Sequence, residues 1–242
     1  MRILIISDIH ANLTALETVL AHAQGQWDKI WCLGDLVGYG PDPNECVQLI
    51  QQFDHIALSG NHDWAVLGRL DVTTFNRDAQ IAIEWTRKTI TAETRAYLET
   101  LPSSITLEPF TLAHASPRQP VWEYILDSYT AAMNFSYFDT PYCLVGHTHV
   151  PVLFEEVDIT QIVAHTPIYD VPIQLEKPRL IINPGSVGQP RDADPRAAYA
   201  LLDTDAMTWE FRRVRYPISE TQERMRKFDI PPRLIQRLEY GL

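Results

Sequence analysis

Short apolar runs alternate with amphipathic segments through the first sixty residues of the chain. The runs at 2–6, 29–33 and 55–58 have the length and the nearly continuous apolar character of buried parallel strands. Between them, the segments 13–23 and 44–52 place apolar residues at helical spacing. The pattern therefore predicts a βαβαβ unit with right-handed crossovers, which is the opening of an α/β fold.

The middle of the chain mixes helical and strand-like patterns. From residue 63 to 101 the pattern is helical, most clearly at 79–90 and 92–101, and Pro102 ends the second of these helices. Further strands and one helix are predicted beyond this point. The strand-like runs are 105–113, 142–145, 152–157, 179–182 and 198–202, and the helix is 128–138.

The last third of the chain predicts a hairpin and a helical tail. The hairpin strands are expected at 199–203 and 207–214, and one or two helices at 219–238, broken at Pro231 and Pro232. The segment 158–177 is weakly patterned and contains prolines, so it predicts no more than edge strands.

The composition is that of a globular chain. Its 242 residues are 45% hydrophobic and 21% charged, which is enough to bury a large core in one unit. We therefore predict a single domain over residues 1–242, with a small helical cap-like insert at about 64–104. The formal net charge of -11 provides no positive field to attract a phosphate backbone, so nucleic-acid binding is not expected.

Cysteine spacing and hydropathy indicate the cellular compartment of the protein. Cys32, Cys46 and Cys143 show no CxxC spacing, which favours a reducing compartment over a disulfide framework. The apolar run at 2–6 is too short for the core of a signal peptide, and no run reaches membrane-spanning length. We expect a cytoplasmic protein without membrane contact.

Five short strings of acidic, amide and imidazole side chains stand where predicted strands end. They are Asp8-Ile9-His10, Gly34-Asp35, Gly60-Asn61-His62-Asp63, His114 and Gly146-His147-Thr148-His149. In open α/β sheets, ligands bind beyond the carboxyl ends of the strands, so these strings should converge on one crevice. Oxygen and imidazole ligands without thiolate favour manganese, iron, nickel, cobalt or zinc over a structural zinc site. The sequence therefore predicts a catalytic metal.

The ordered series of strings resembles the signature of the calcineurin-like metallophosphoesterases. Within that superfamily the chain is similar to the small bacterial and archaeal phosphoesterases, because residues 183–188, Asn-Pro-Gly-Ser-Val-Gly, resemble their glycine turn after a core strand. The family usually has glycine after the lone histidine, where this chain has Ala115. The resemblance implies a four-layer α/β/β/α sandwich of two mixed sheets with flanking helices.

The resemblance also implies a set of ligands for two divalent transition-metal ions, with manganese first among the candidates. In this set Asp35 bridges the two ions. Asp8, His10 and His149 would hold one ion, and Asn61, His114 and His147 would hold the other.

The implied activity is the hydrolysis of phosphate esters, as a phosphodiesterase, a phosphomonoesterase or a protein phosphatase. Two adjacent ions lower the pKa of a shared water, and the resulting bridging hydroxide would attack the phosphorus. His62 is placed to protonate the leaving oxygen as general acid, with Asp63 fixing its tautomer. Arg191, Arg118 and Asn61 are candidates for contacts to the substrate phosphate.

Two other functions remain open on the sequence. A non-catalytic protein-interaction scaffold on the same fold would be expected to lose the proton donor or some ligands, whereas His62 and all seven ligand positions are present. A nuclease would be expected to carry a basic surface, which the net charge disfavours. The sequence does not indicate the physiological ester, the native metal or the oligomeric state.

Overall fold

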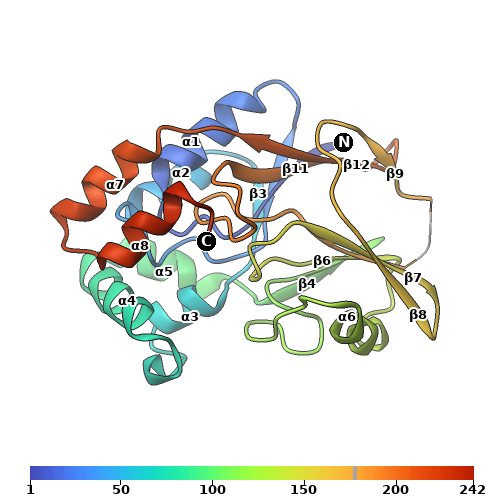
Figure 1. The fold of residues 1–242 in the computed structure, drawn as a ribbon, viewed down its shortest axis with the longest axis horizontal. Helices are drawn as coiled ribbons and strands as arrows, with labels where there is room; N and C mark the ends of the chain where they lie inside the picture. The colour runs from blue at the N-terminus through green and yellow to red at the C-terminus, as the bar shows by residue number, and fades with distance from the viewer. Residues whose placement is uncertain (177–178) are drawn as a thin grey trace.

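The computed structural model describes residues 1–176 and 179–242, and its centre is a pair of facing β-sheets (Figure 1). The first sheet has the strand order β3-β2-β1-β11-β12-β9 and the second β4-β5-β6-β10-β7-β8. The strands of the first sheet are β1 (Arg2–Ile6), β2 (Lys29–Cys32), β3 (His55–Ala57), β9 (Ile173–Gln174), β11 (Ala197–Asp203) and β12 (Thr208–Val214). Those of the second sheet are β4 (Ser104–Leu107), β5 (Phe110–Ala113), β6 (Tyr142–Leu144), β7 (Val152–Asp158), β8 (Gln161–His165) and β10 (Leu180–Asn183).

Parallel pairing within each sheet brings several strand ends to one edge. β1, β2 and β3 run parallel in the first sheet, and β5, β6 and β10 run parallel in the second. β11 is antiparallel to β1, and β7 is antiparallel to β10, so both sheets are mixed. The carboxyl ends of β1, β2 and β3 therefore lie together, and so do those of β5 and β6.

Helices flank the two sheets (Figure 1). Four of them, α1, α4, α5 and α6, begin at polar residues whose side chains accept a backbone N–H of the first turn: Asn12, Asn76, Thr91 and Asp127. The helices are α1 (Leu13–His22), α2 (Pro43–Ile50), α3 (Asn61–Val66), α4 (Arg77–Thr89), α5 (Ala92–Thr100), α6 (Ser128–Asn134), α7 (Ile218–Lys227) and α8 (Pro232–Gln236), with short 3₁₀ turns at Val72–Thr74, Phe135–Tyr137 and Arg237–Glu239.

Successive residues of β1 face different layers. Ile3 belongs to a buried cluster that also holds Phe110 of the second sheet, so this cluster lies between the sheets. Leu4 belongs to a cluster with Leu16 of α1, on the outer face of the first sheet. On the outer face of the second sheet, Phe135 after α6 belongs to a further cluster with strand residues of that sheet. The predicted four-layer α/β/β/α sandwich is confirmed, and burial on both faces explains the continuous apolar run of β1.

The predicted strand at 105–113 is wrong in one respect, because the structure divides it into two. β4 and β5 form an antiparallel hairpin in which Leu107 pairs with Phe110, and Glu108 and Pro109 make the turn. Proline has no backbone N–H to donate to a ladder, and this is why the strand cannot continue through residue 109.

The weakly patterned segment 158–177 supplies edge strands, as expected. β8 is the edge of the second sheet and β9 the edge of the first. Residue 177, where this segment ends, lies outside the described residues, as does residue 178. The predicted hairpin corresponds to β11 and β12, and the helical tail to α7 and α8, which are separated near Pro231 as predicted.

The predicted helical insert contains the second half of α3 and the whole of α4 and α5. Ile83 of α4 and Leu98 of α5 join the cluster on the outer face of the first sheet, so these helices share the layer of α1 and α2. α7 and α8 pack against α4 and Tyr39 in a further cluster. The assignment of residues 1–242 to one domain stays a prediction. Among the described residues, no helix combines the length and the hydropathy that a membrane span requires.

Candidate metal centre

The five strings meet between the two sheets. Asp8, Asp35 and Asn61 follow β1, β2 and β3 of the first sheet, whereas His114 and His147 follow β5 and β6 of the second. Backbone hydrogen bonds join the strings: the Asp8 N–H donates to the Gly34 carbonyl oxygen at 3.0 Å, and the Gly146 N–H donates to the His114 carbonyl oxygen at 2.7 Å. The predicted crevice is therefore built from the facing edges of the two sheets.

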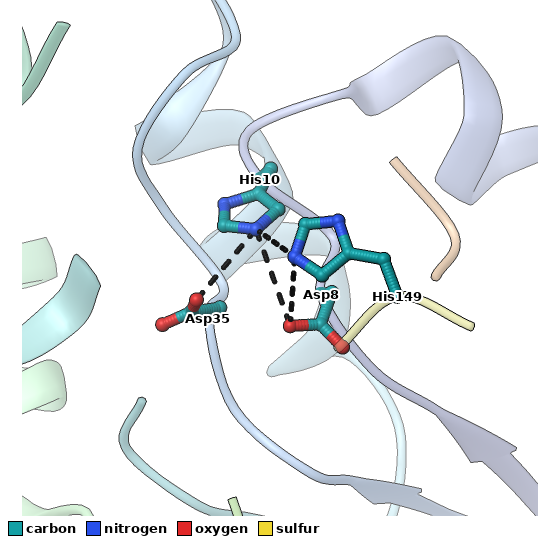
Figure 2. Close-up of side chains that lie close together, drawn as sticks. All are labelled: Asp8, His10, Asp35 and His149. Atoms are coloured by element: carbon teal, nitrogen blue, oxygen red, sulfur yellow. Dashed lines mark hydrogen bonds and ion pairs between the residues drawn. The ribbon is translucent and has the colours of Figure 1, made fainter. Parts of the chain in front are cut away.

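One cluster of candidate ligand atoms contains Asp8, His10, Asp35 and His149, all buried (Figure 2). The Nε2 atoms of His10 and His149 lie 3.0 Å apart. His149 Nε2 lies 3.3 Å from Asp8 Oδ1, and His10 Nε2 lies 3.6 Å from Asp35 Oδ2. Nitrogen and oxygen lone pairs from two sheets thus point at one small space.

A second cluster shares Asp35 with the first. It contains Asp35, His114 and His147, with His114 Nε2 at 3.5 Å from Asp35 Oδ2. The side-chain oxygen of Asn61 lies 3.3 Å from the same imidazole nitrogen. The structure therefore brings together all seven residues that the sequence nominated as ligands, and it places Asp35 in both clusters.

The tautomers of three of the imidazoles are set by backbone carbonyl groups. The Nδ1 atoms of His10, His114 and His149 lie 3.3, 2.8 and 2.5 Å from the carbonyl oxygens of Val37, Leu33 and Gln189. A carbonyl oxygen only accepts, so each Nδ1 carries the proton and each Nε2 presents a lone pair. This is the arrangement that metal-binding histidines use.

Several polar atoms of the clusters lack a suitable partner within the protein, and a bound cation would provide one. With both Nδ1 atoms protonated, the Nε2 lone pairs of His10 and His149 face each other at 3.0 Å with no proton between them. In addition, the buried atoms Asp35 Oδ2 and His147 Nε2 have no hydrogen-bond partner among the described residues. Buried polar atoms without partners are costly, and a divalent ion would satisfy all of these at once.

The protonation states agree with this interpretation. Burial lowers the pKa of all four candidate histidine ligands, that of His149 to about 4, so these imidazoles are neutral at pH 7 as metal binding requires. Burial, and then the nearby charges of Asp63 and Asp8, raise the pKa of Asp35 well above its usual value. A buried carboxylate surrounded by other acids needs a positive charge beside it, and bound cations would supply that charge.

The backbone of the site is strained. Five of the seven candidate ligands lie in the left-handed region, which costs non-glycine residues on the order of 1–3 kcal/mol each. Their φ values are 53° for Asp8, 48° for His10, 53° for Asp35, 64° for His147 and 61° for His149. Such conformations persist where the surrounding structure imposes them, and they concentrate at functional sites.

His62 lies beside the clusters, but Asp63 does not hold it as expected. The ring of His62 lies 4.9 Å from that of His10, and its Nδ1 has no hydrogen-bond partner among the described residues. The carboxylate of Asp63 instead accepts the backbone N–H groups of Gly60 at 2.9 Å and of Val37 at 3.1 Å. The predicted contact that would fix the tautomer of His62 is therefore wrong, and Asp63 ties together the loops after β2 and β3.

The two candidate phosphate-binding arginines differ in their surroundings. Arg191 donates to Gln189 Oε1 at 3.1 Å and lies over the ring of Tyr39, 5.8 Å from its centroid. Burial, and then the charge of Arg191, lower the pKa of His62. Arg118 is engaged by Glu123 through both Nε and Nη2. Arg191 thus stands near the clusters with hydrogen-bonding capacity left over, whereas the guanidinium of Arg118 is already paired.

Aromatic side chains near the clusters were not nominated by the sequence. The ring of Tyr39 lies 4.7 Å from that of His10, and the ring of Tyr124 lies 3.9 Å from that of His147. Phe75 packs against His62, with ring centroids 5.3 Å apart. The only signal for Tyr39 was its position between Gly38 and Gly40, in the loop that carries Asp35.

Comparisons with known proteins agree on one family. Residues 1–207 match the model of the calcineurin-like phosphoesterase superfamily domain. An uncharacterized protein of Methanocaldococcus jannaschii is 39% identical, and the match covers 99% of this chain and 98% of that protein.

Solved structures show the same fold along the whole chain. The crystal structure of a metallophosphoesterase from Sphaerobacter thermophilus has a TM-score of 0.92 at 50% identity, covering 100% of this chain and 99% of that one. The crystal structure of a hypothetical protein from Pyrococcus horikoshii has a TM-score of 0.82 at 18% identity, covering 100% and 98%. At that identity, the second likeness concerns the fold alone.

Proposed function

This chain belongs to the calcineurin-like phosphoesterase superfamily, and we propose that it hydrolyses phosphate esters with the help of two divalent transition-metal ions. The observation that carries the proposal is the carboxylate of Asp35, which is common to two buried clusters of ligand atoms. A shared carboxylate between two sets of neutral imidazoles is what a pair of adjacent cations requires.

The two clusters indicate which ligand residues would hold each ion. Asp8, His10 and His149 would hold one ion, Asn61, His114 and His147 the other, and Asp35 both. When bound, the ions supply an activated water and positive charge for the oxygens of the phosphate. Oxygen and imidazole nitrogen ligands without thiolate fit manganese, iron, nickel, cobalt or zinc, and we place manganese first among these candidates.

The remaining steps fall to side chains beside the clusters. His62 donates the proton to the leaving oxygen, and its position is tied to the centre because its backbone N–H donates to Asp35 Oδ1 at 2.9 Å. Gly38 leaves room for this ring, since a side chain at residue 38 would come within 2.6 Å of His62 Nδ1. Arg191 binds a phosphate oxygen through its Nε–H group, because its bond to Gln189 uses Nη2 and leaves Nε without a partner among the described residues.

Metal titration of the metal-depleted chain tests the ligand assignment. With Mn²⁺ followed by calorimetry and elemental analysis, we expect two ions per wild-type chain and one in each of His149→Ala and His147→Ala. Asp35→Asn should weaken both sites. His165→Gln, at an exposed position on β8, is the matched control and should still bind two ions. Two full sites in Asp35→Asn would contradict the bridging role.

Turnover tests the chemistry separately from the metal. The Mn²⁺-loaded chain should hydrolyse p-nitrophenyl phosphate or its bis ester, and the ratio of the two rates reports the preference for monoesters or diesters. His62→Ala should keep its metals and lose roughly 100- to 10,000-fold in rate, the usual contribution of a general acid. Metal binding without turnover of any ester would favour the interaction scaffold, and unchanged turnover in His62→Ala would remove the proton-donor role.

A further inference from the structure

Two large aromatic side chains are exposed next to the metal centre. Tyr124 is 46% exposed and Trp122 is 40% exposed. The ring of Tyr124 is tilted by only 32° from that of buried His147, with centroids 3.9 Å apart, so one face of the tyrosine covers a candidate ligand. An exposed ring stacked on a ligand marks the side on which the buried clusters approach solvent.

Trp122 reaches the other side of the site through one intermediate ring. It packs edge-on against Phe75 at 5.2 Å, and Phe75 packs edge-on against His62 at 5.3 Å. Trp122 is therefore connected to the proposed proton donor, and Tyr124 to a ligand of the second cluster. The two exposed rings stand two residues apart on one loop, between β5 and α6.

The residue between them, Glu123, holds this loop in place. Its carboxylate accepts hydrogen bonds from Ser116 Oγ and Asn134 Nδ2, each at 2.8 Å, and pairs with Arg118. The side chain of Asn134, on α6, also accepts the backbone N–H of Arg118 at 3.1 Å. The pairing of Arg118 thus has a positioning role, because it keeps Glu123 turned inward while its two neighbours in sequence stay exposed.

We propose that Trp122 and Tyr124 bind a flat aromatic group carried by the substrate, so that the preferred esters bear a nucleobase or an aryl group near the phosphate. This rests on the proposed phosphoesterase activity, whose metal clusters hold the phosphate. An aromatic face is the best partner for another flat ring, and such stacking contributes on the order of 10-fold or more in affinity for each base. Rings on a loop anchored by the partly buried Glu123 lose less freedom on binding than rings on a mobile loop, which favours this use.

The test compares two phosphates that differ only in the aromatic group. Adenosine 5′-monophosphate and ribose 5-phosphate are titrated into the Mn²⁺-loaded protein by calorimetry, and the ratio of their dissociation constants is the readout. We expect the wild type to favour the adenosine compound by about 10-fold or more. Tyr124→Leu and Trp122→Leu should each reduce that preference several-fold. Tyr129→Leu, at a 77% exposed ring on α6, is the control and should keep the preference.

The outcomes separate this inference from the proposed function. Equal affinity for the two phosphates in the wild type, or an unchanged preference in both leucine variants at residues 122 and 124, would overturn the aromatic site even if esters are hydrolysed. A preference that depends on these two residues supports the site, even if no ester is turned over and the proposed hydrolysis fails.

Discussion

Replacing Gly60 by alanine should damage the metal centre through Asp35. Gly60 has φ -98°, an ordinary value for any residue, so alanine adds no backbone strain there. The added Cβ, however, would lie 2.7 Å from both Asp35 Cγ and the Asp35 backbone nitrogen, closer than real Cβ atoms approach their neighbours. The carboxylate shared by the two clusters must therefore move.

The expected magnitude follows from the size of the overlap. The Asp35 carboxylate has to retreat by on the order of 1 Å, and a misplacement of this size costs roughly 100-fold in rate. Crowding of a packed interior also destabilises the fold by about 1–3 kcal/mol. For a chain of this length each kcal/mol lowers Tm by roughly 2–4 °C, so the variant should still be folded at 25 °C.

The assay combines kcat/KM for p-nitrophenyl phosphate with the dissociation constants of the two Mn²⁺ ions and with Tm. Gly25→Ala is the inverse control: Gly25 has φ +76° and no heavy atom within 4 Å of the added Cβ, so alanine strains the backbone without touching the site. It should lose about 1–2 kcal/mol of stability and keep both metals. Two tightly bound ions and unchanged kcat/KM in Gly60→Ala would refute this account of Asp35.

Two further predictions concern carboxylates outside the ligand set. Asp63→Ala leaves buried backbone N–H groups without an acceptor, so chemical denaturation should show a loss of roughly 3 kcal/mol, and a loss below 1 kcal/mol would count against the loop-tying role. The pKa of Glu123 lies below its usual 4.5, chiefly because Arg118 donates a hydrogen bond to its carboxylate. The ionised Glu123 therefore stabilises the fold fully above pH 4.5, and this stabilisation is lost as the pH falls through the lowered pKa. Tm should therefore fall less steeply below pH 4.5 in Glu123→Gln than in the wild type, and parallel curves would contradict the assignment.

Local pattern was sufficient for most of the secondary structure and for the chemistry of the site. Strand β1 and helix α1 follow from the spacing of apolar residues, and the Asp8-x-His10 and His147-x-His149 pairs follow from their places after strands. The strand at 105–113 was divided because a proline turn lies inside an otherwise strand-like run, and periodicity alone gives such a turn too little weight.

The amino-acid sequence by itself determined which side chains are available as ligands and roughly where each strand and helix lies, because these depend on neighbours within a few residues. Only the tertiary structure decided that Asp63 bonds backbone groups rather than His62, and that the ring of Tyr124 covers His147. Each of these contacts joins residues brought together by the facing of two sheets or by long loops. Their geometry depends on the packing of the whole chain, and no short stretch of sequence encodes it.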